Sequence, residues 1–182
     1  IVRATTMDGH RLATATMDGE IGDVAQTIPT NAVKIIAGMV DGQSDAAIGF
    51  KSPDVFVRVG TQTFASKLLE SQFPPFEQVI PKSHDTRASV DGPSMAGAVK
   101  RASSMVDKGK SGPGVKLTFG DALGIFAEGV DKGSGSEEVE CSVKGPPVTI
   151  GANAAYVMDS LAKIEGAAEI DLTDPLSPIV IR

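Results

Sequence analysis

A histidine near an aspartate is the pair in this sequence that could do acid–base chemistry. His10 follows Asp8 by two residues, and Asp18 is the next carboxylate along the chain. A histidine oriented by a carboxylate can act as a general base near neutral pH. A hydrolase also needs a nucleophile, and no serine or cysteine stands beside His10 in a recognisable catalytic motif. A small α+β hydrolase-like enzyme that uses His10 is therefore kept as an alternative.

The other residues of reactive type favour structural roles. Cys141 alternates with two valines, as a small apolar residue of a strand would. The two histidines, His10 and His84, are too few and too far apart in sequence to indicate a metal site. The glycine-rich stretches 109–114 and 133–135 do not match the full G-x-x-x-x-G-K-[S/T] pattern of a phosphate-binding loop, nor its strand–loop–helix setting. We expect neither a metal nor a cofactor.

Composition and charge are those of a globular protein of one or two domains. Of 182 residues, 41% are hydrophobic and 22% charged, and no apolar run reaches the roughly 20 residues of a membrane span. The formal net charge of -6 argues against tight nucleic-acid binding, unless basic side chains gather on one face. A single cysteine excludes an internal disulfide framework and fits a reducing, cytoplasmic setting.

The hydrophobic pattern predicts an α+β fold. Apolar residues spaced i, i+3, i+4 and i+7 predict three helices, at residues 30–40, 93–106 and 152–163. Their apolar stripes are Val33, Ile36, Ala37 and Val40; Met95, Ala98, Val99 and Ala102; and Ala154, Val157, Met158 and Leu161. Alternating segments predict strands at residues 2–6, 12–17, 55–59, 63–68, 115–119, 123–128, 138–143 and 179–182. Loops are expected at 107–114 and 131–135, and a polar linker at 81–87.

An internal repeat relates the two ends of the chain. Residues 28–32, IPTNA, resemble residues 150–154, IGANA, 122 positions later. The similarity continues at 46–48 with 168–170, at 52–53 with 174–175 and at 57–58 with 181–182. A helix followed by two strands, found twice at domain-length spacing, predicts two copies of one fold. The alternative is a coincidence between two generic helix–strand pairs.

The two copies differ at their ends. A predicted helix precedes the strands at 115–119 and 123–128 of the second copy, but none precedes the strand at 2–6. The first copy has a further strand at 63–68, whereas the second stops at Arg182. We therefore expect the chain to start and end inside domains, as a fragment or the ordered part of a longer protein.

Three short motifs follow one another along the chain. Residues 8–13 read DGHRLA, in which Asp-Gly is a hairpin-turn signal. The sequence SKL at 66–68 is followed by FPPFEQVIPK at 73–82, and Asn153 and Tyr156 stand at i and i+3 near a predicted helix start. In this order the motifs resemble those of the bacterial beta sliding clamp family, and the resemblance extends over nearly the whole chain.

The resemblance implies a DNA clamp fold, with repeated domains and helices on one face of antiparallel sheets. Residues 1–84 would be part of a middle clamp domain without its N-terminal part, and residues 85–182 a C-terminal clamp domain without its last strand. The full protein would be a non-catalytic processivity factor, a head-to-tail homodimeric ring around duplex DNA. Its other partners would be the clamp loader, DNA polymerase III and further replication and repair proteins, which bind through short linear peptides.

The resemblance also implies a hydrophobic pocket for those peptides. The matching positions are Gly9, His10, Arg11, Leu12, Pro74, Val79, Asn153, Tyr156, Leu176 and Pro178. Met7 stands where the family usually has threonine, and Gln78 where a basic residue is often found. Both departures bear on which peptides the pocket would prefer. On residue types alone, Asn153 and Tyr156 could equally be a helix start with a packed aromatic.

Basic residues on the helices are the expected contacts with duplex DNA. Lys34, Lys100 and Arg101 lie away from the apolar stripes of their helices. In a clamp such helices line the hole, so these side chains would meet phosphates without reading base sequence. The negative charge would then lie on the outer strands. The alternatives are ordinary surface residues at these positions, and a clamp-like protein that does not close a ring.

Overall fold

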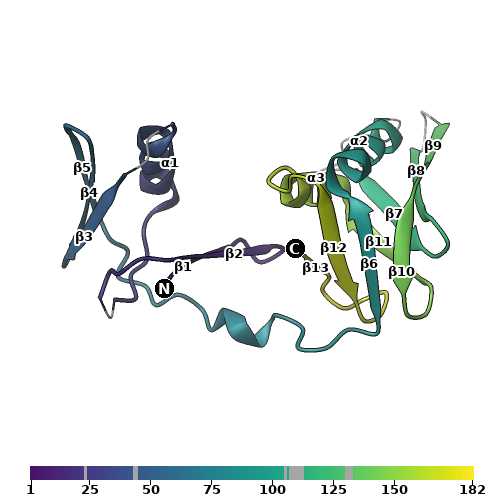
Figure 1. The fold of residues 1–182 in the computed structure, drawn as a ribbon, viewed down its shortest axis with the longest axis horizontal. Helices are drawn as coiled ribbons and strands as arrows, with labels where there is room; N and C mark the ends of the chain where they lie inside the picture. The colour runs from purple at the N-terminus through teal and green to yellow at the C-terminus, as the bar shows by residue number, and fades with distance from the viewer. Residues whose placement is uncertain (23, 43–44, 105, 107–112, 130–132) are drawn as a thin grey trace. The chain divides into compact units, whose positions relative to one another are not determined.

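The chain folds into two compact units, each with its own core. The computed structural model describes all residues except 23, 43–44, 105, 107–112 and 130–132 (Figure 1). Unit 1 is Ile1–Phe76 and unit 2 is Glu77–Arg182. The expected loop at 107–114 falls almost wholly outside the described residues.

Unit 1 combines a hairpin, a helix and a three-stranded antiparallel sheet. The hairpin pairs β1 (Val2–Met7) with β2 (Leu12–Met17) along their full length. The helix and the sheet, in the order β3-β4-β5, are α1 (Thr30–Val40), β3 (Ala47–Lys51), β4 (Asp54–Val59) and β5 (Gln62–Lys67). In Figure 1 the helix α1 stands beside this sheet.

The core of unit 1 forms where α1 meets β4. Every second residue of β4 is buried, namely Val55, Val57 and Val59, as expected for a strand with one face on a core. From α1, the residues packed against these valines are Ile36, Met39 and Val40. The predicted stripe was wrong for Val33, which is 46% exposed, and for Ala37, which is also exposed. Because α1 carries apolar residues nearly all round, its periodicity could not select the buried face.

Unit 2 contains two four-stranded antiparallel sheets and two helices. One sheet has the order β10-β6-β12-β13 and the other β11-β7-β8-β9. The strands are β6 (Thr86–Asp91), β7 (Gly114–Phe119), β8 (Leu123–Gly129), β9 (Gly133–Val139), β10 (Cys141–Lys144), β11 (Val148–Asn153), β12 (Ala167–Leu172) and β13 (Val180–Ile181). The helices α2 (Gly92–Ser103) and α3 (Ala154–Leu161) pack against each other. In Figure 1 they lie together at one end of the sheets.

The apolar stripes predicted for α2 and α3 are confirmed. Met95, Ala98, Val99 and Ala102 of α2 and Ala154, Val157 and Leu161 of α3 are buried, and Met158 packs against the same core. Alternate residues of both sheets complete this core, which is much larger than that of unit 1. Helices packed on antiparallel sheets in both units confirm the α+β class.

The internal repeat is confirmed in the order and pairing of the elements. The helix α1 is followed by the antiparallel pair β3–β4, and α3 by the antiparallel pair β12–β13. The aligned segments 52–53 and 174–175 both lie between the two strands of their pair. An antiparallel hairpin precedes each helix, β1–β2 in unit 1 and β7–β8 in unit 2.

One predicted strand and one predicted loop were wrong around β9. Residues 138–143 are not one strand, because the chain passes at Glu140 from β9 in one sheet to β10 in the other. Residues 133–135 belong to β9, although glycines suggested a loop. Gly135 is required by packing, since a Cβ there would lie 2.7 Å from the carbonyl oxygen of Ala102 on α2.

Several helices and strands begin or end at other residues than predicted. Thr86 and Arg87 begin β6 and are not part of a linker, because their side chains bond to Pro146 and Asp171 within unit 2. The third helix begins after Asn153, whose side chain caps it. The second helix ends at Ser103, three residues earlier than predicted. The strands β6 and β11 were not predicted, and β3 and β12 were expected only through the repeat, at residues 46–48 and 168–170.

Candidate functional site

The tip of the β1–β2 hairpin in unit 1 holds Gly9, His10 and Arg11 in a fixed turn. Gly9 has a φ of 86°, in the left-handed region that glycine adopts without strain. The Asp8 Oδ1 atom accepts hydrogen bonds from the backbone N–H of His10 at 3.0 Å and of Arg11 at 2.8 Å. This is the Asx-type turn that aspartate favours. Leu12 begins β2 opposite Met7 and is half-buried.

The Arg11 side chain closes the same turn. Its Nε and Nη2 atoms donate to Asp8 Oδ2 at 3.0 and 2.8 Å, a two-pronged arginine–carboxylate pair. The side-chain hydrogen bonds from Arg11, followed by the two backbone hydrogen bonds, lower the pKa of Asp8 from 3.8 to about 2. Both oxygens of Asp8 therefore serve the turn itself, which fixes the backbone that presents His10 and Arg11.

The segment that links the two units exposes several apolar residues. In unit 1, Phe73 and Phe76 meet edge to face with ring centroids 6.1 Å apart, and Pro74 between them is exposed. A short 3-10 helix, η1 (Phe76–Gln78), follows. In unit 2, the Val79 side chain is 52% exposed.

Asn153 and Tyr156 lie together at the start of α3 in unit 2. The Asn153 Oδ1 atom accepts from the backbone N–H of Ala155 at 2.9 Å and of Tyr156 at 3.4 Å, so this residue is the N-cap of the helix. The structural role expected from residue types is therefore present. Asn153 also borders an open hollow of about 540 Å³, whose lining includes Phe126 and Gly151.

A tight turn between β12 and β13 presents Leu176 to solvent. The Asp174 Oδ1 atom accepts from the backbone N–H of Leu176 at 2.8 Å and of Ser177 at 2.9 Å, and the Ser177 hydroxyl donates to Asp174 Oδ2. Leu176 is 96% exposed, and Pro178 after it is exposed too. Asp174 was not predicted as a turn residue, although an aspartate three residues before a serine is a recognisable turn signal.

The expected DNA contacts differ in their surroundings. Lys34 on α1 and Lys100 on α2 are exposed. Arg101 on α2 donates from Nε and Nη2 to Glu137 Oε2 on β9, at 3.1 and 2.7 Å. Hydrogen bonding to Glu137 raises the pKa of Arg101, so the arginine stays charged while part of its charge is balanced within unit 2. This pairing was not predicted.

Each unit thus gathers its own share of the expected residues. Unit 1 brings Gly9, His10, Arg11 and Leu12 together in one hairpin turn. In unit 2, Asn153 and Tyr156 share the start of α3, Leu176 and Pro178 share the β12–β13 turn, and Val79 lies in the N-terminal segment.

The residues that the structure describes hold neither a metal-binding cluster nor a membrane-spanning helix. Among those residues, no group of three histidine, cysteine, aspartate or glutamate side chains is placed to hold a metal ion. None of the described helices has the length and apolar character needed to cross a membrane. Cys141 packs half-buried against the unit 2 core, and burial raises the pKa of its thiol, as expected for a structural cysteine.

Comparison with known proteins places both units in one family. The model for the central domain of the DNA polymerase III beta subunit matches residues 1–75. The model for the C-terminal domain of the same subunit matches residues 77–182. The junction between the two matches coincides with the junction between the two compact units.

Individual relatives agree with these matches. The beta sliding clamp of Caulobacter vibrioides is 29% identical over 187 residues, which cover 99% of this chain and 50% of that protein. The beta sliding clamp of Staphylococcus aureus is 28% identical over 186 residues, covering 98% of this chain and 48% of that protein. The chain therefore spans about half the length of the curated relatives it matches.

Solved structures give the same result for the fold. A sliding clamp from Bartonella birtlesii, bound to griselimycin, matches with a TM-score of 0.90 and 27% identity, over 99% of this chain and 50% of that one. A DNA polymerase sliding clamp from Pseudomonas aeruginosa matches with a TM-score of 0.91 and 25% identity, over 99% of this chain and 50% of that one. Two family models in succession cover nearly every residue, so this chain belongs to the DNA polymerase III beta subunit family, the bacterial beta sliding clamps.

Proposed function

We propose that the protein acts as a DNA sliding clamp, a processivity factor that encircles duplex DNA and tethers the replicative polymerase. The observation that carries this proposal is the succession of central and C-terminal beta subunit domains along one chain. The protein's partners would be duplex DNA, DNA polymerase III and other replication and repair proteins, and the clamp loader. A homodimeric ring in the cytoplasm is the assembly that this role requires.

Partner proteins would bind through short linear peptides containing glutamine, leucine and phenylalanine. Leu12 and Val79 would contact the peptide's apolar anchors, with Gly9, Pro74, Leu176 and Pro178 adding surface around them. Groups on His10, Arg11, Asn153 and Tyr156 would offer hydrogen bonds to the peptide. The exposure of Val79 and Leu176 is consistent with this role, because both side chains are open to a partner.

Peptide affinity is the direct test of this site. A fluorescent peptide with the Gln-Leu-Phe character should bind the unsubstituted chain, with each buried anchor contributing about 1.5–3 kcal/mol before ordering costs. Val79→Asp or Leu12→Asp should abolish binding in fluorescence anisotropy while the thermal transition stays nearly unchanged. Val33→Asp is the matched control, since Val33 is similarly exposed but lies on α1. Equal losses in the control variant would refute the assigned site.

Duplex DNA would be held by charge and ring closure rather than by base contacts. Neutralising Lys34, Lys100 and Arg101 should weaken duplex binding equally for all base sequences and reduce its salt dependence. A change that depended on base sequence would contradict this role. Ring closure has its own test: a closed ring stays on circular duplex DNA and slides off linear duplex, whereas a clamp-like protein without a ring does not distinguish them.

We also propose that the protein has no catalytic activity. The enzyme alternative requires a nucleophile beside His10, and no serine or cysteine stands next to it in a recognisable catalytic motif. The family relatives are sliding clamps. Turnover of any substrate that is lost in His10→Ala, with the fold intact, would overturn this part of the proposal.

A further inference from the structure

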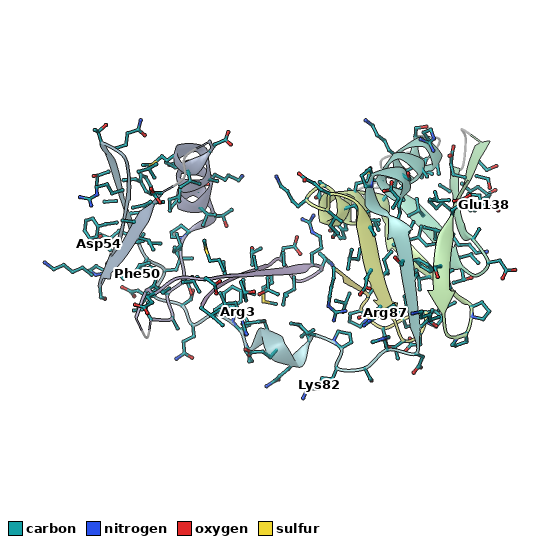
Figure 2. All side chains as sticks on the ribbon, viewed as in Figure 1. Arg3, Phe50, Asp54, Lys82, Arg87 and Glu138 are labelled. Carbon is teal, nitrogen blue, oxygen red and sulfur yellow. The ribbon has the colours of Figure 1, made fainter. Side chains whose placement is uncertain are left out.

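A buried carboxylate in unit 2 is surrounded by basic side chains from three segments. Asp171 on β12 is 4% exposed. Arg87 on β6 donates from Nε to Asp171 Oδ1 at 2.6 Å and from Nη2 to Oδ2 at 3.2 Å (Figure 2 labels Arg87). Arg182, which follows β13, donates from Nη1 to Asp171 Oδ2. The Nε2 atom of His84 lies 3.6 Å from Asp171 Oδ1.

Asp171 stays ionised because these groups outweigh its burial. Burial by itself raises the pKa of Asp171. The hydrogen bonds from Arg87 and Arg182 lower it by more, so the net pKa is below the ordinary value. A buried ion pair is seldom more stabilising than well-packed apolar residues of the same volume. We therefore ask which part of unit 2 these ion pairs hold in position, in addition to any stability that they contribute.

The element held in position is the strand β13. This strand has two residues and pairs with β12 at Ile170↔Ile181 and Asp171↔Val180. Glu169 and Arg182 then exchange two backbone hydrogen bonds, both 2.9 Å long. The Arg182 side chain reaches across to Asp171 from the same place. The contact between Arg182 and Asp171 therefore adds to the pairing of β13 with β12.

The loop between β12 and β13 carries the exposed Leu176 and is tied at both ends. At its start, the Thr173 hydroxyl donates to the Ser83 carbonyl oxygen at 3.2 Å. Within it, Asp174 fixes the turn through the backbone N–H groups of Leu176 and Ser177. At its end, β13 is secured by Asp171 through Arg182. The turn can hold Leu176 in one place only while both ends are held.

We propose that Asp171 is a positioning residue for peptide binding: by holding β6, β12 and β13 together through Arg87 and Arg182, it fixes the turn that presents Leu176. This inference rests on the proposed peptide-binding function, and it adds a residue outside the expected pocket. Asp171 itself does not touch the peptide. Its effect reaches the peptide through the order of the β12–β13 turn.

The test removes the charge of Asp171 and keeps the size and shape of its side chain. Asp171→Asn should speed amide hydrogen exchange at Leu176, Ser177 and Arg182. It should weaken binding of the Gln-Leu-Phe peptide by roughly tenfold, the size expected when one leucine contact with the peptide is lost. Glu138→Gln is the matched control. It removes an exposed carboxylate from β9, in the other sheet of unit 2, so it should change neither measurement.

A double substitution separates positioning from general destabilisation. In a Leu176→Ala background, Asp171→Asn should cause little further loss of peptide affinity, because the side chain that it positions is gone. A full additional tenfold loss would overturn the inference, as would unchanged exchange in Asp171→Asn. If Asp171→Asn fails to fold, Arg182→Gln breaks the same contact from its exposed side and should give the same local increase in exchange. Failure of the unsubstituted chain to bind the peptide would instead refute the proposed function.

Discussion

Two aspartates hold the loops that carry the expected peptide contacts. Asp8 and Asp174 each accept backbone hydrogen bonds from the residues two and three positions later. In both turns the acidic side chain accepts hydrogen bonds from the backbone, and most of the residues that follow are exposed. The pKa of Asp8 is lowered to about 2 and that of Asp174 is also lowered, chiefly by the hydrogen bond from Ser177. These aspartates therefore have a structural role, which is to fix the backbone of two exposed turns.

The Asp8 turn should open only in strong acid. A carboxylate whose folded pKa is depressed contributes stability above its unfolded pKa and loses it as pH falls through the folded value. The carboxyl carbon of Asp8, followed by NMR, should therefore titrate near pH 2 instead of at its ordinary value of 3.8. In Arg11→Gln the midpoint should rise towards the ordinary value, because the largest cause of the shift is removed. A midpoint of 3.8 in the unsubstituted chain would contradict the turn geometry.

The pairing of Arg101 with Glu137 gives a second prediction for single residues. If Arg101 faces duplex phosphates, Glu137→Gln should free it and strengthen low-salt duplex binding by a few-fold, with a steeper salt dependence. Glu138→Gln is the matched control, because this neighbouring carboxylate points to the exposed face of the same strand (labelled in Figure 2). Equal gains in both variants, measured by anisotropy, would assign the effect to net charge alone.

At the scale of elements, α3 links the core of unit 2 to Asn153 and Tyr156. Leu161 is buried near the end of this helix, so Leu161→Ala should lower the free energy of unfolding by about 2–5 kcal/mol. The exposed Ser160 beside it is the control, and Ser160→Ala should change stability by less than about 0.5 kcal/mol. Urea unfolding followed by circular dichroism measures both. Similar effects of the two substitutions would contradict the packing described for α3.

The sequence predicted the elements best where one face alone is apolar. The buried stripes of α2 and α3 and the alternating strands β4, β7 and β8 follow directly from this pattern. The buried face of α1 could not be predicted, because apolar residues surround the helix. The strand β12 was expected only through the repeat, because Asp171 interrupts its apolar pattern. The contacts with Arg87 and Arg182 make that carboxylate tolerable in a buried place.

The candidate site was predicted from motifs, and its supporting residues were not. Gly9 to Leu12 and Asn153 with Tyr156 do form local turns or caps, as short-range patterns suggested. The pairing of Arg101 with Glu137 joins residues 36 positions apart, and that of Arg87 with Asp171 joins residues 84 apart. No periodicity relates such positions, so contacts of this kind appear only once the chain is folded.

At the scale of the whole molecule, the two cores differ greatly in size. Among the described residues, the buried apolar side chains of unit 1 are Ala32, Val55, Val57 and Val59, whereas those of unit 2 come from two sheets and two helices. Stability grows with the apolar area removed from water, so the two units should not be equally stable. The separate cores also allow each unit to unfold without the other.

We therefore expect the 182-residue chain to unfold in two steps, with unit 1 first. Hydrogen exchange in increasing urea should expose the amides of β4 at low concentration and those of β7 and β12 only at high concentration. Val57→Ala should lower only the first midpoint and Leu117→Ala only the second, because each side chain belongs to one core. A single transition in which both substitutions shift every amide together would mean that the units form one cooperative structure. Limited proteolysis gives an independent check: a resistant product close to Glu77–Arg182 should survive after unit 1 has been digested.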